Sequence, residues 1–360
     1  MTHHKKQILI VTQAIDANDP VLGFFVRWVE EFSKHADHIE VICLKKGKYD
    51  LPENVTVHSL GKENEKRQEP HAPGGARRMG RRATYALRFI SLIWKLRHNY
   101  DTVFVHMNQE YILIAGWIWK LMGKRIYLWR NHYAGSWRTD IAAGFCTKVF
   151  CTSKHSYTAK YKKTVLLPVG IDTSRFSQNI NITRTPHSIL SLGRIAPSKH
   201  LEIFIDALAM LARENIDFSA TIVGSPLPKD ESYYDSLKEK VRKFGIESRV
   251  TFLQGVPNSE TPSLYQAHEI FVNTTPSGAF DKTLFEAVAC GCVVLAESKD
   301  FAELVGESTF FDSSDSLHKN LLRVLSTPNI GKIEGNISDI LKKQTLHVLF
   351  TKIIKEITKL

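Results

Sequence analysis

The sequence predicts an α/β protein with two doubly wound domains, each a parallel sheet covered by helices on both faces. Short apolar runs rich in Val, Ile and Phe alternate with amphipathic helical patterns along most of the 360 residues. A polar stretch without periodicity, at residues 177–187, separates two such series. The length also favours two domains, because single hydrophobic cores stop growing beyond about 250–300 residues.

The first series predicts a domain over residues 1–170. Its strands are expected at residues 8–13, 38–44, 55–60, 102–107, 125–129, 148–152 and 164–169. Helical patterns lie between most of them, the clearest at residues 22–35, 85–98 and 111–122. Strands that are apolar along their whole length and separated by helices indicate a parallel sheet buried on both faces.

The second series follows a linker at 171–187 and predicts a domain over residues 188–336. Its strands are expected at residues 188–195, 218–223, 250–254, 269–273 and 293–296. Its helices are expected at residues 201–213, 233–244, 259–268 and 284–290. Open parallel sheets bind ligands at the carboxyl ends of their strands, so two such domains predict a ligand cleft. The tail at 337–360 is helical in pattern.

The amino-acid composition narrows down the binding partners and the cellular compartment that we expect for this protein. The net charge of +11 indicates an anionic partner, which is nucleic acid, phospholipid or a phosphorylated small molecule. The longest apolar run, residues 111–119, is about half of the roughly 20 residues that cross a bilayer. The five cysteines show no zinc spacing and no export signal precedes them, so we expect reduced thiols in a cytoplasmic protein.

Most of the excess positive charge lies in a basic stretch, residues 66–97. Its opening portion, with Arg77, Arg78, Arg81 and Arg82, is predicted to be a flexible loop that leads into a helix. Exposed Arg beside aromatic residues suits an anionic membrane surface or a lipid-linked acceptor, at about 1 kcal/mol for each basic residue. A solvated loop without a ligand is the alternative. The sequence contains no nucleic-acid-binding motif, so binding to nucleic acid is not expected.

The strongest chemical pattern lies early in the second domain. The strand at 188–192 ends in Gly193 and Arg194, and Lys199 follows directly before the helix at 201–213. Gly193 allows a sharp backbone turn, so the two cations bracket the entrance to that helix. Fixed positive charge at the carboxyl end of a strand suits a diphosphate. A surface loop with two solvated cations is the alternative that the pattern leaves open.

A second pattern follows the strand at 269–273. A turn and a loop of small residues lead into a helix that begins near Lys282. The first N–H groups of that helix have no intrahelical partners and would point toward the same edge of the sheet. Glu286 lies one turn into the helix between apolar neighbours, where a carboxylate needs partners such as paired ligand hydroxyls. A structural or capping contact is the alternative.

Together with a third element these patterns resemble a known enzyme family. The three elements are Gly193-Arg194 with Lys199, the run from Pro276 to Val294, and Pro168-x-Gly170-Ile171-Asp172 with Phe176. In order and spacing the sequence resembles the family 4 retaining glycosyltransferases of the GT-B fold, over essentially the whole chain. The resemblance implies two Rossmann-like domains facing each other across a cleft, with the helix at 337–360 crossing back to the first domain.

The resemblance also implies roles for individual residues. Arg194 and Lys199, beside Gly193, would hold the diphosphate of a nucleotide-sugar donor, and Glu286 would accept hydrogen bonds from the ribose. Backbone groups between them would border the sugar and cap a phosphate, through Gly278, Ala279, Phe280, Thr283 and Leu284. In the first domain, Gly23 would allow close approach of the donor, and His132 would lie near the transferred sugar.

One position departs from the family pattern. The family has two Glu residues with seven residues between them, and Gly278 stands at the first of these positions while Glu286 stands at the second. The carboxylate that commonly contacts the sugar hydroxyls is therefore missing. Asp281 and Lys282, in the same loop, are candidates to supply polar contacts in its place. The identity of the sugar is left open by this change.

The resulting hypothesis is a retaining, metal-independent glycosyltransferase without a cofactor. It would move a sugar from a UDP- or GDP-sugar to an acceptor hydroxyl, on a lipid-linked or glycan acceptor of the cell surface. The enzyme would be cytoplasmic and peripheral on the inner face of the cell membrane. The alternatives are a sugar-nucleotide epimerase on the same fold, and a non-catalytic protein that binds membrane or nucleic acid through the basic stretch.

Overall fold

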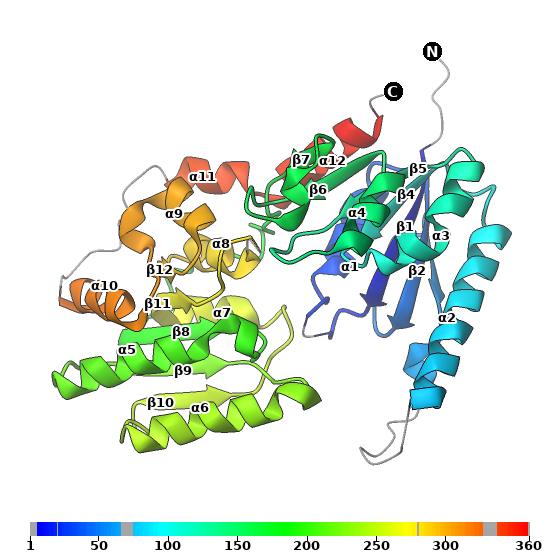
Figure 1. The fold of residues 1–360 in the computed structure, drawn as a ribbon. Coiled ribbons are helices and arrows are strands. Elements are labelled where there is room, and N and C mark those ends of the chain that lie inside the picture. Colours follow the sequence, from blue (N-terminus) through cyan, green and yellow to red (C-terminus); the bar gives the residue numbers. More distant parts are fainter. Residues whose placement is uncertain (1–5, 20, 66–74, 279–280, 327–336, 359–360) are drawn as a thin grey trace. The chain divides into compact units, whose positions relative to one another are not determined.

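The chain forms two α/β units, each organised around one parallel sheet (Figure 1). The computed structural model describes residues 6–19, 21–65, 75–278, 281–326 and 337–358. The first unit comprises residues 1–151, 157–167 and 350–360, and the second comprises residues 152–156 and 168–349. The predicted α/β class with two parallel sheets is confirmed.

The sheet of the first unit has the strand order β3-β2-β1-β4-β5-β6-β7, and every pair is parallel. Its strands are β1 (Gln7–Ile15), β2 (His38–Lys46), β3 (Val55–Ser59), β4 (Thr102–His106), β5 (Arg125–Trp129), β6 (Lys148–Cys151) and β7 (Thr164–Leu166). In the centre of the sheet, Ile10 lies opposite Val41 on one side and Phe104 on the other. All three side chains are fully buried, as expected for a sheet covered on both faces.

Helices cover both faces of this sheet. They are α1 (Phe25–Ser33), α2 (Gly75–Lys95), α3 (Glu110–Leu121), α4 (Trp137–Phe145) and the end of α12 (Leu346–Thr358). On one face α2, α3 and α4 share a core with β1, in which Phe89 and Trp119 pack near Val11. On the other face, Phe32 of α1 packs edge-on against Phe104 and Phe350, with ring centroids 4.9 and 4.7 Å away.

The predicted flexible loop with Arg77, Arg78, Arg81 and Arg82 is wrong, because these residues lie in α2. Strong helix formers such as Ala, Arg, Met and Leu, with no proline, favour a helix from residue 75 onward. Arg81 Nη1 lies 3.5 Å from the carboxylate of Glu65, while the side chains of Arg77 and Arg78 lie outside the described structure. Residues 66–74 of the basic stretch also lie outside it.

The structure also contains helices that we did not predict, in segments where the amphipathic pattern extends over few residues. Helix α4 has a capping box between Ser136 and Thr139, whose side chains each accept a hydrogen bond from the other's backbone N–H. In the second unit α9 (Lys299–Val305) and α10 (Ser314–Ser326) follow the last strand. The tail forms two helices, α11 (Ile337–Lys343) and α12, rather than one.

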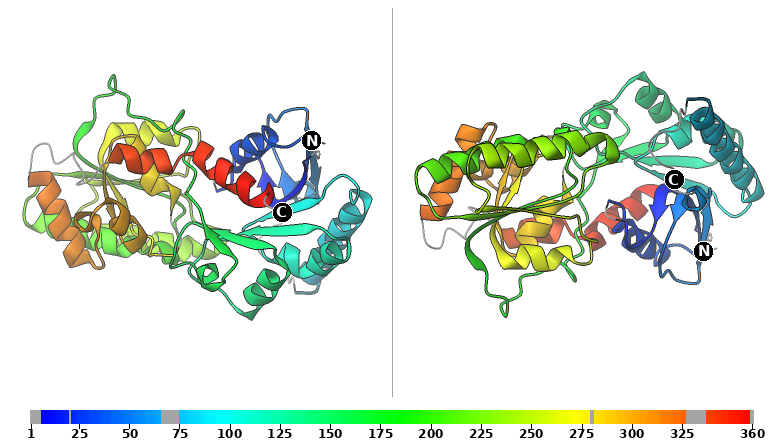
Figure 2. Two further views of the ribbon diagram at one scale, coloured as in Figure 1. Left: turned by 90° about the horizontal axis from the view of Figure 1, so that it is seen from above. Right: turned by 90° about the horizontal axis from the view of Figure 1, so that it is seen from below.

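The sheet of the second unit has the order β10-β9-β8-β11-β12, again with every pair parallel. Its strands are β8 (Thr185–Leu192), β9 (Ser219–Val223), β10 (Val250–Leu253), β11 (His268–Asn273) and β12 (Val293–Ala296). Its other helices are α5 (Leu201–Arg213), α6 (Glu231–Lys243), α7 (Thr261–Ala267) and α8 (Lys282–Ala289). Helices lie on both faces of this sheet (Figures 1 and 2), and successive strand residues face opposite helix layers. Ile189 packs with α5, α6 and α10, whereas Leu190 packs with α7, α8 and α9.

Gly170 occupies a position that only glycine fills without strain. Its φ of 75° lies in the left-handed region, and a Cβ placed on it would lie 2.4 Å from Leu349 Cδ2. The adjacent Ile171 donates its N–H to the Gln344 carbonyl and accepts from Leu346 N–H. Gly170 therefore fixes how the chain leaves β7 and meets the start of α12. Among the described residues, no helix is both long and apolar enough to cross a membrane.

We predict that Gly170→Ala lowers the free energy of unfolding by about 1–3 kcal/mol, through the strained φ and the clash with Leu349. Differential scanning calorimetry would show a lower transition midpoint. The matched control is Gly144→Ala in α4, where the added Cβ would have no atom within 4 Å apart from its chain neighbours and the backbone of its own helix. That change should stabilise the helix by up to about 1 kcal/mol. Equal midpoints for the two variants would contradict this account.

Candidate active site

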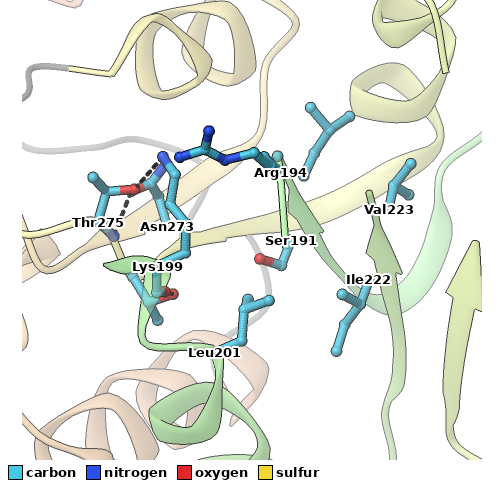
Figure 3. A pocket seen from close by; sticks show the side chains of 11 residues that line it. Ser191, Arg194, Lys199, Leu201, Ile222, Val223, Asn273 and Thr275 are labelled. Carbon is cyan, nitrogen blue, oxygen red and sulfur yellow. Dashed lines mark hydrogen bonds between the residues drawn. The ribbon is translucent and has the colours of Figure 1, made fainter. Parts of the chain in front are cut away.

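The strand order of the second unit creates a ligand position between β8 and β11. From β8 the chain moves to β9 and β10 on one side, and later returns to β11 and β12 on the other. The loops that follow β8 and β11 therefore leave the sheet in opposite directions, which opens a crevice at their carboxyl ends. A pocket lies there (Figure 3), lined by Ser191, Leu192, Gly193, Arg194, Lys199, Leu201, Ile222, Val223, Asn273, Thr274 and Thr275.

Arg194 supplies one cation to this pocket. It follows Gly193, whose N–H is bonded to the Val223 carbonyl at 3.0 Å, so the neighbouring strand β9 fixes the turn. The Arg194 side chain is exposed and extends across the pocket toward the side that holds Lys199 and Thr275 (Figure 3). Within the described ranges, no hydrogen bond or ion pair engages its guanidinium group. It is therefore available to an anionic ligand.

Lys199 supplies a second cation, and this one is paired. It ends the short 3-10 helix η3 (Pro197–Lys199) that precedes α5. Its Nζ donates to Thr275 Oγ1 at 2.9 Å and lies 2.8 Å from Asp281 Oδ2. The Thr274 hydroxyl donates to the Lys199 carbonyl, so both ends of this residue are held by the loop after β11. The ammonium is consequently fixed in place beside the Arg194 side chain.

Asp281 is the counter-charge of Lys199 and the N-cap of α8. Its Oδ1 accepts the Thr283 N–H at 3.2 Å, and its carbonyl accepts the Leu284 N–H at 3.3 Å. Burial favours the neutral carboxyl, but the Lys199 ammonium and the donors from Thr283 outweigh it and lower the pKa of Asp281. The Thr283 hydroxyl is also held, at 2.9 Å from Asn273 Nδ2. The N–H groups of Thr283 and Leu284, predicted to cap a phosphate, thus donate to Asp281 in this structure.

Glu286 lies one turn further along α8, and it is buried. The hydroxyl of Tyr265 donates to its Oε2 at 3.3 Å. Burial raises the pKa of Glu286, although the nearby Lys282 ammonium opposes this shift. Burial likewise lowers the pKa of Lys282, whose Nζ donates to the Gly170 carbonyl at 3.4 Å. The carboxylate therefore lies in a shielded position where additional hydroxyl donors would favour its ionised form.

The loop between β11 and α8 is anchored at Gly278. Its φ of 92° requires glycine, and its N–H donates to Asp300 Oδ2 at 3.1 Å. Asp300 is buried and also accepts a hydrogen bond from the hydroxyl of Ser153, at 2.8 Å. The two following predicted residues, Ala279 and Phe280, lie outside the described residues.

The two remaining predicted residues lie in the first unit. Gly23 follows β1, and a Cβ there would lie 2.7 Å from the carbonyl oxygens of both Ala17 and Asp19. His132 follows β5, where its Nδ1 accepts the Ala134 N–H at 2.9 Å and its ring stacks on Tyr133. The structure thus brings together Gly193, Arg194, Lys199 and Asp281 within the second unit, with Thr283 and Glu286 on the adjoining helix.

Sequence reasoning missed several residues that build the site. Asn273 and Thr275 line the pocket and hold Thr283 and Lys199, and Tyr265 and Asp300 hold Glu286 and Gly278. Asn273 and Thr275 could have been found, because they end a strand that lies beside β8 in this sheet order. Asp300 could not, since nothing in the sequence near residue 300 indicates a contact with the loop at Gly278.

The comparisons with known proteins concern the same region. A family model described as "Glycosyl transferases group 1" matches residues 172–331. Mannosylfructose-phosphate synthase of Agrobacterium fabrum is 29% identical over 147 residues, which cover 38% of this chain and 32% of that protein. Alpha-monoglucosyldiacylglycerol synthase of Streptococcus pneumoniae is 24% identical over 194 residues, 49% of this chain and 43% of that protein. The chain thus spans less than half the length of these curated relatives.

Among solved structures, Anabaena HepE in complex with UDP and glucose is similar in fold. The TM-score is 0.77 at 18% identity, covering 99% of this chain and 100% of that one. In the part of the chain that the structure describes, no three His, Cys, Asp or Glu side chains are grouped so that they would hold a metal ion.

The pairing of Asp281 with Lys199 leads to a prediction about stability. Asp281→Asn keeps the helix cap but leaves the half-buried ammonium without its counter-charge, so we expect a loss of about 1–3 kcal/mol at pH 7. The folded-state pKa of Asp281 is lowered, so its contribution is present above the unfolded value of about 4 and is lost as the pH falls through the folded-state pKa.

Thermal unfolding of both proteins between pH 7 and pH 3 measures this contribution. The difference in midpoint should shrink at the acid end of the series. Asp217→Asn is the matched control, because that carboxylate is 90% exposed and should leave the midpoint unchanged. A difference that stays constant over the whole pH range would contradict the proposed role of the charge.

Proposed function

We propose that this chain is a group 1 glycosyl transferase, which the family model over residues 172–331 supports, and that it transfers a sugar from a nucleotide-diphosphate donor to an acceptor hydroxyl with retention of anomeric configuration. The single observation that carries this proposal is the pocket between β8 and β11, where Arg194 and Lys199 lie together. Two cations at the carboxyl end of a parallel sheet match the charge of a diphosphate.

The proposed chemistry depends on charge that develops on the leaving group. As the glycosidic bond breaks, negative charge grows on the diphosphate, and fixed cations stabilise it more in the transition state than in the ground state. Arg194 has a guanidinium free of described partners, and Lys199 is already oriented by Thr275 and Asp281. We propose that no metal ion is required and that a phosphate oxygen of the leaving group takes the proton of the acceptor hydroxyl.

In this proposal, Asp281 is the partner of Lys199 as long as no donor is bound. Its carboxylate accepts hydrogen bonds from Lys199 and from the Thr283 N–H, so it occupies an anion position at the start of α8. A diphosphate that binds Lys199 competes with this carboxylate for the same ammonium. Asp281 therefore keeps the cation oriented in the absence of donor, and the two phosphates replace it as the partner when donor is bound.

The nucleoside end of the donor is assigned to Glu286. Its buried carboxylate accepts hydrogen bonds from the Tyr265 hydroxyl, at 3.3 Å, and from the Asn258 side chain, and two ribose hydroxyls would be further donors to it. The donor sugar is assigned to the loop at Gly278, whose N–H is held by Asp300. We also propose that His132 contributes near the transferred sugar, as the family resemblance implies. A lipid-linked or glycan acceptor is favoured by relatives such as alpha-monoglucosyldiacylglycerol synthase.

We predict that replacing both charges of the ion pair nearly abolishes transfer. The double variant Lys199→Met with Asp281→Asn leaves no unpaired buried charge, so folding is preserved while the cation is lost. Its turnover should fall about 100- to 1000-fold. The measurement is release of nucleoside diphosphate from a panel of UDP- and GDP-sugars with glycan and lipid acceptors.

The control for this experiment is Lys319→Ala on α10, which removes an exposed cation outside the pocket. Its turnover should equal that of the parent protein. Normal turnover in the double variant would show that Lys199 has no role in the mechanism. If the parent protein releases no nucleoside diphosphate with any donor of the panel, the proposed reaction is wrong.

We predict separately that Glu286→Gln weakens nucleotide binding about 10- to 100-fold, because hydrogen bonds to a charged acceptor are replaced by neutral ones. Isothermal titration with UDP and with GDP measures this, and also decides which base is preferred. Glu269→Gln is the control, because that carboxylate lies at the start of β11, at the opposite end of the strand from the pocket. Unchanged affinity in Glu286→Gln would place the ribose elsewhere.

A further inference from the structure

Three tryptophans are exposed on one helical layer of the first unit. Trp94 of α2, Trp117 of α3 and Trp137 of α4 have exposed fractions of 59%, 53% and 65%. The other three tryptophans of the chain, at positions 28, 119 and 129, are buried. Large aromatic side chains are costly to leave in water, so their concentration on one layer indicates a surface that is covered in use.

The three helices lie side by side and share one core (Figure 1). Phe89 of α2 packs against Tyr111 and Trp119 of α3, with ring centroids 4.9 and 6.0 Å away. Their inner faces are thus satisfied by the sheet and by each other. The exposed tryptophans are not displaced core residues but belong to the outer face of this layer.

Aliphatic residues extend the same outer face. Leu87 of α2, Leu121 of α3 and Ile141 of α4 are 68%, 81% and 46% exposed. Helix α3 is apolar almost all the way round, with the sequence EYILIAGWIWKL. A helix of this kind is normally buried on every side, yet one side of α3 faces solvent. We call Leu87, Trp94, Trp117, Leu121, Trp137 and Ile141 the outer apolar face.

Positive charge accompanies this face. Residues 70–100 contain seven Arg and Lys and no Asp or Glu, although Arg81 pairs with Glu65 and Arg88 donates to the Leu60 carbonyl. The guanidinium of Arg97 lies 4.8 Å from the ring centroid of Trp94, and that of Arg138 lies 5.4 Å from the ring centroid of Trp137. Lys120 is exposed between Trp117 and Leu121. Aromatic rings next to cations are the side chains that favour the boundary between lipid headgroups and acyl chains.

We propose that the outer apolar face docks this protein on an anionic lipid bilayer, in the plane of the headgroups and without spanning the membrane. The tryptophan and leucine side chains enter the interface, and the Arg and Lys side chains contact lipid phosphates. Charge complementarity selects this occupant over a second copy of the chain, because α2 of a second copy carries the same positive charge. The inference goes beyond sugar transfer and does not depend on it.

The test is sedimentation of the full chain with vesicles of phosphatidylcholine, with and without 30% phosphatidylglycerol. The parent protein should bind the anionic vesicles and only weakly the zwitterionic ones. The variant Trp94→Ser, Trp117→Ser, Leu121→Ser should bind about 10-fold more weakly or worse for each side chain removed. The variant Lys95→Gln, Lys120→Gln should lose about fivefold for each charge, and this loss should vanish in high salt.

Two further variants control for loss of folding and for the location of the substituted residues. Leu121→Ser alone alters a side chain that is 81% exposed, so it should weaken vesicle binding while the thermal midpoint stays that of the parent. Ile180→Ser with Lys243→Gln removes an exposed apolar residue and an exposed cation from the second unit, and should bind vesicles normally.

Three results would overturn the proposal. The first is equal vesicle binding by the parent and by the variant that lacks the two tryptophans and Leu121. The second is absence of vesicle binding together with a concentration-dependent dimer that this variant loses, which would assign the face to a second copy. The third is retention of single-stranded RNA without vesicle binding, which would assign the positive charge to nucleic acid.

Discussion

The ion pair between Lys199 and Asp281 is the interaction on which the candidate site depends. It joins the loop after β8 to the start of α8, two segments that are more than 80 residues apart and meet only because β8 and β11 are neighbours. The same carboxylate caps α8, so the position of the helix and the orientation of the ammonium are set together. Under the proposed function, the position for the donor diphosphate is thereby organised before the donor binds.

This arrangement separates two kinds of cation within one pocket. Lys199 is held by a hydroxyl and a carboxylate, whereas Arg194 has no described partner and projects from a turn fixed by strand β9. A diphosphate would meet a preoriented ammonium and an adaptable guanidinium fork. Glu286 lies apart from them on α8, where burial raises its pKa and the side chains of Tyr265 and Asn258 donate hydrogen bonds to it. Under the proposed function, the cations for the diphosphate thus come from the loop after β8, and the carboxylate for the ribose comes from α8.

The class of the fold and the location of most elements follow from the amino-acid sequence alone. The strands predicted at residues 125–129 and 293–296 coincide with β5 and β12. Strands that are buried on both faces are apolar along most of their length, so their ends are easy to locate in a sequence. The sequence also identified Gly193, Arg194 and Lys199 as one group, since they lie within seven residues of each other. The prediction of a flexible loop at residues 75–82 is wrong, because it rests on the Gly and Arg residues there as signs of a loop. In the structure these residues belong to α2, which ends at Lys95.

The contacts of the predicted residues, in contrast, depend on the packing of the complete fold. That Asp281 neutralises Lys199, that Asp300 holds Gly278, and that three tryptophans share one exposed layer all follow from strand order and helix packing. These contacts join residues that are far apart in the chain, and a pattern of local periodicity contains no information about which distant partner a polar side chain will meet. A motif such as Gly193-Arg194 with Lys199 consists of residues close together in the sequence and can be identified there. Ion pairs and the solvent exposure of side chains depend on which elements pack together in the fold.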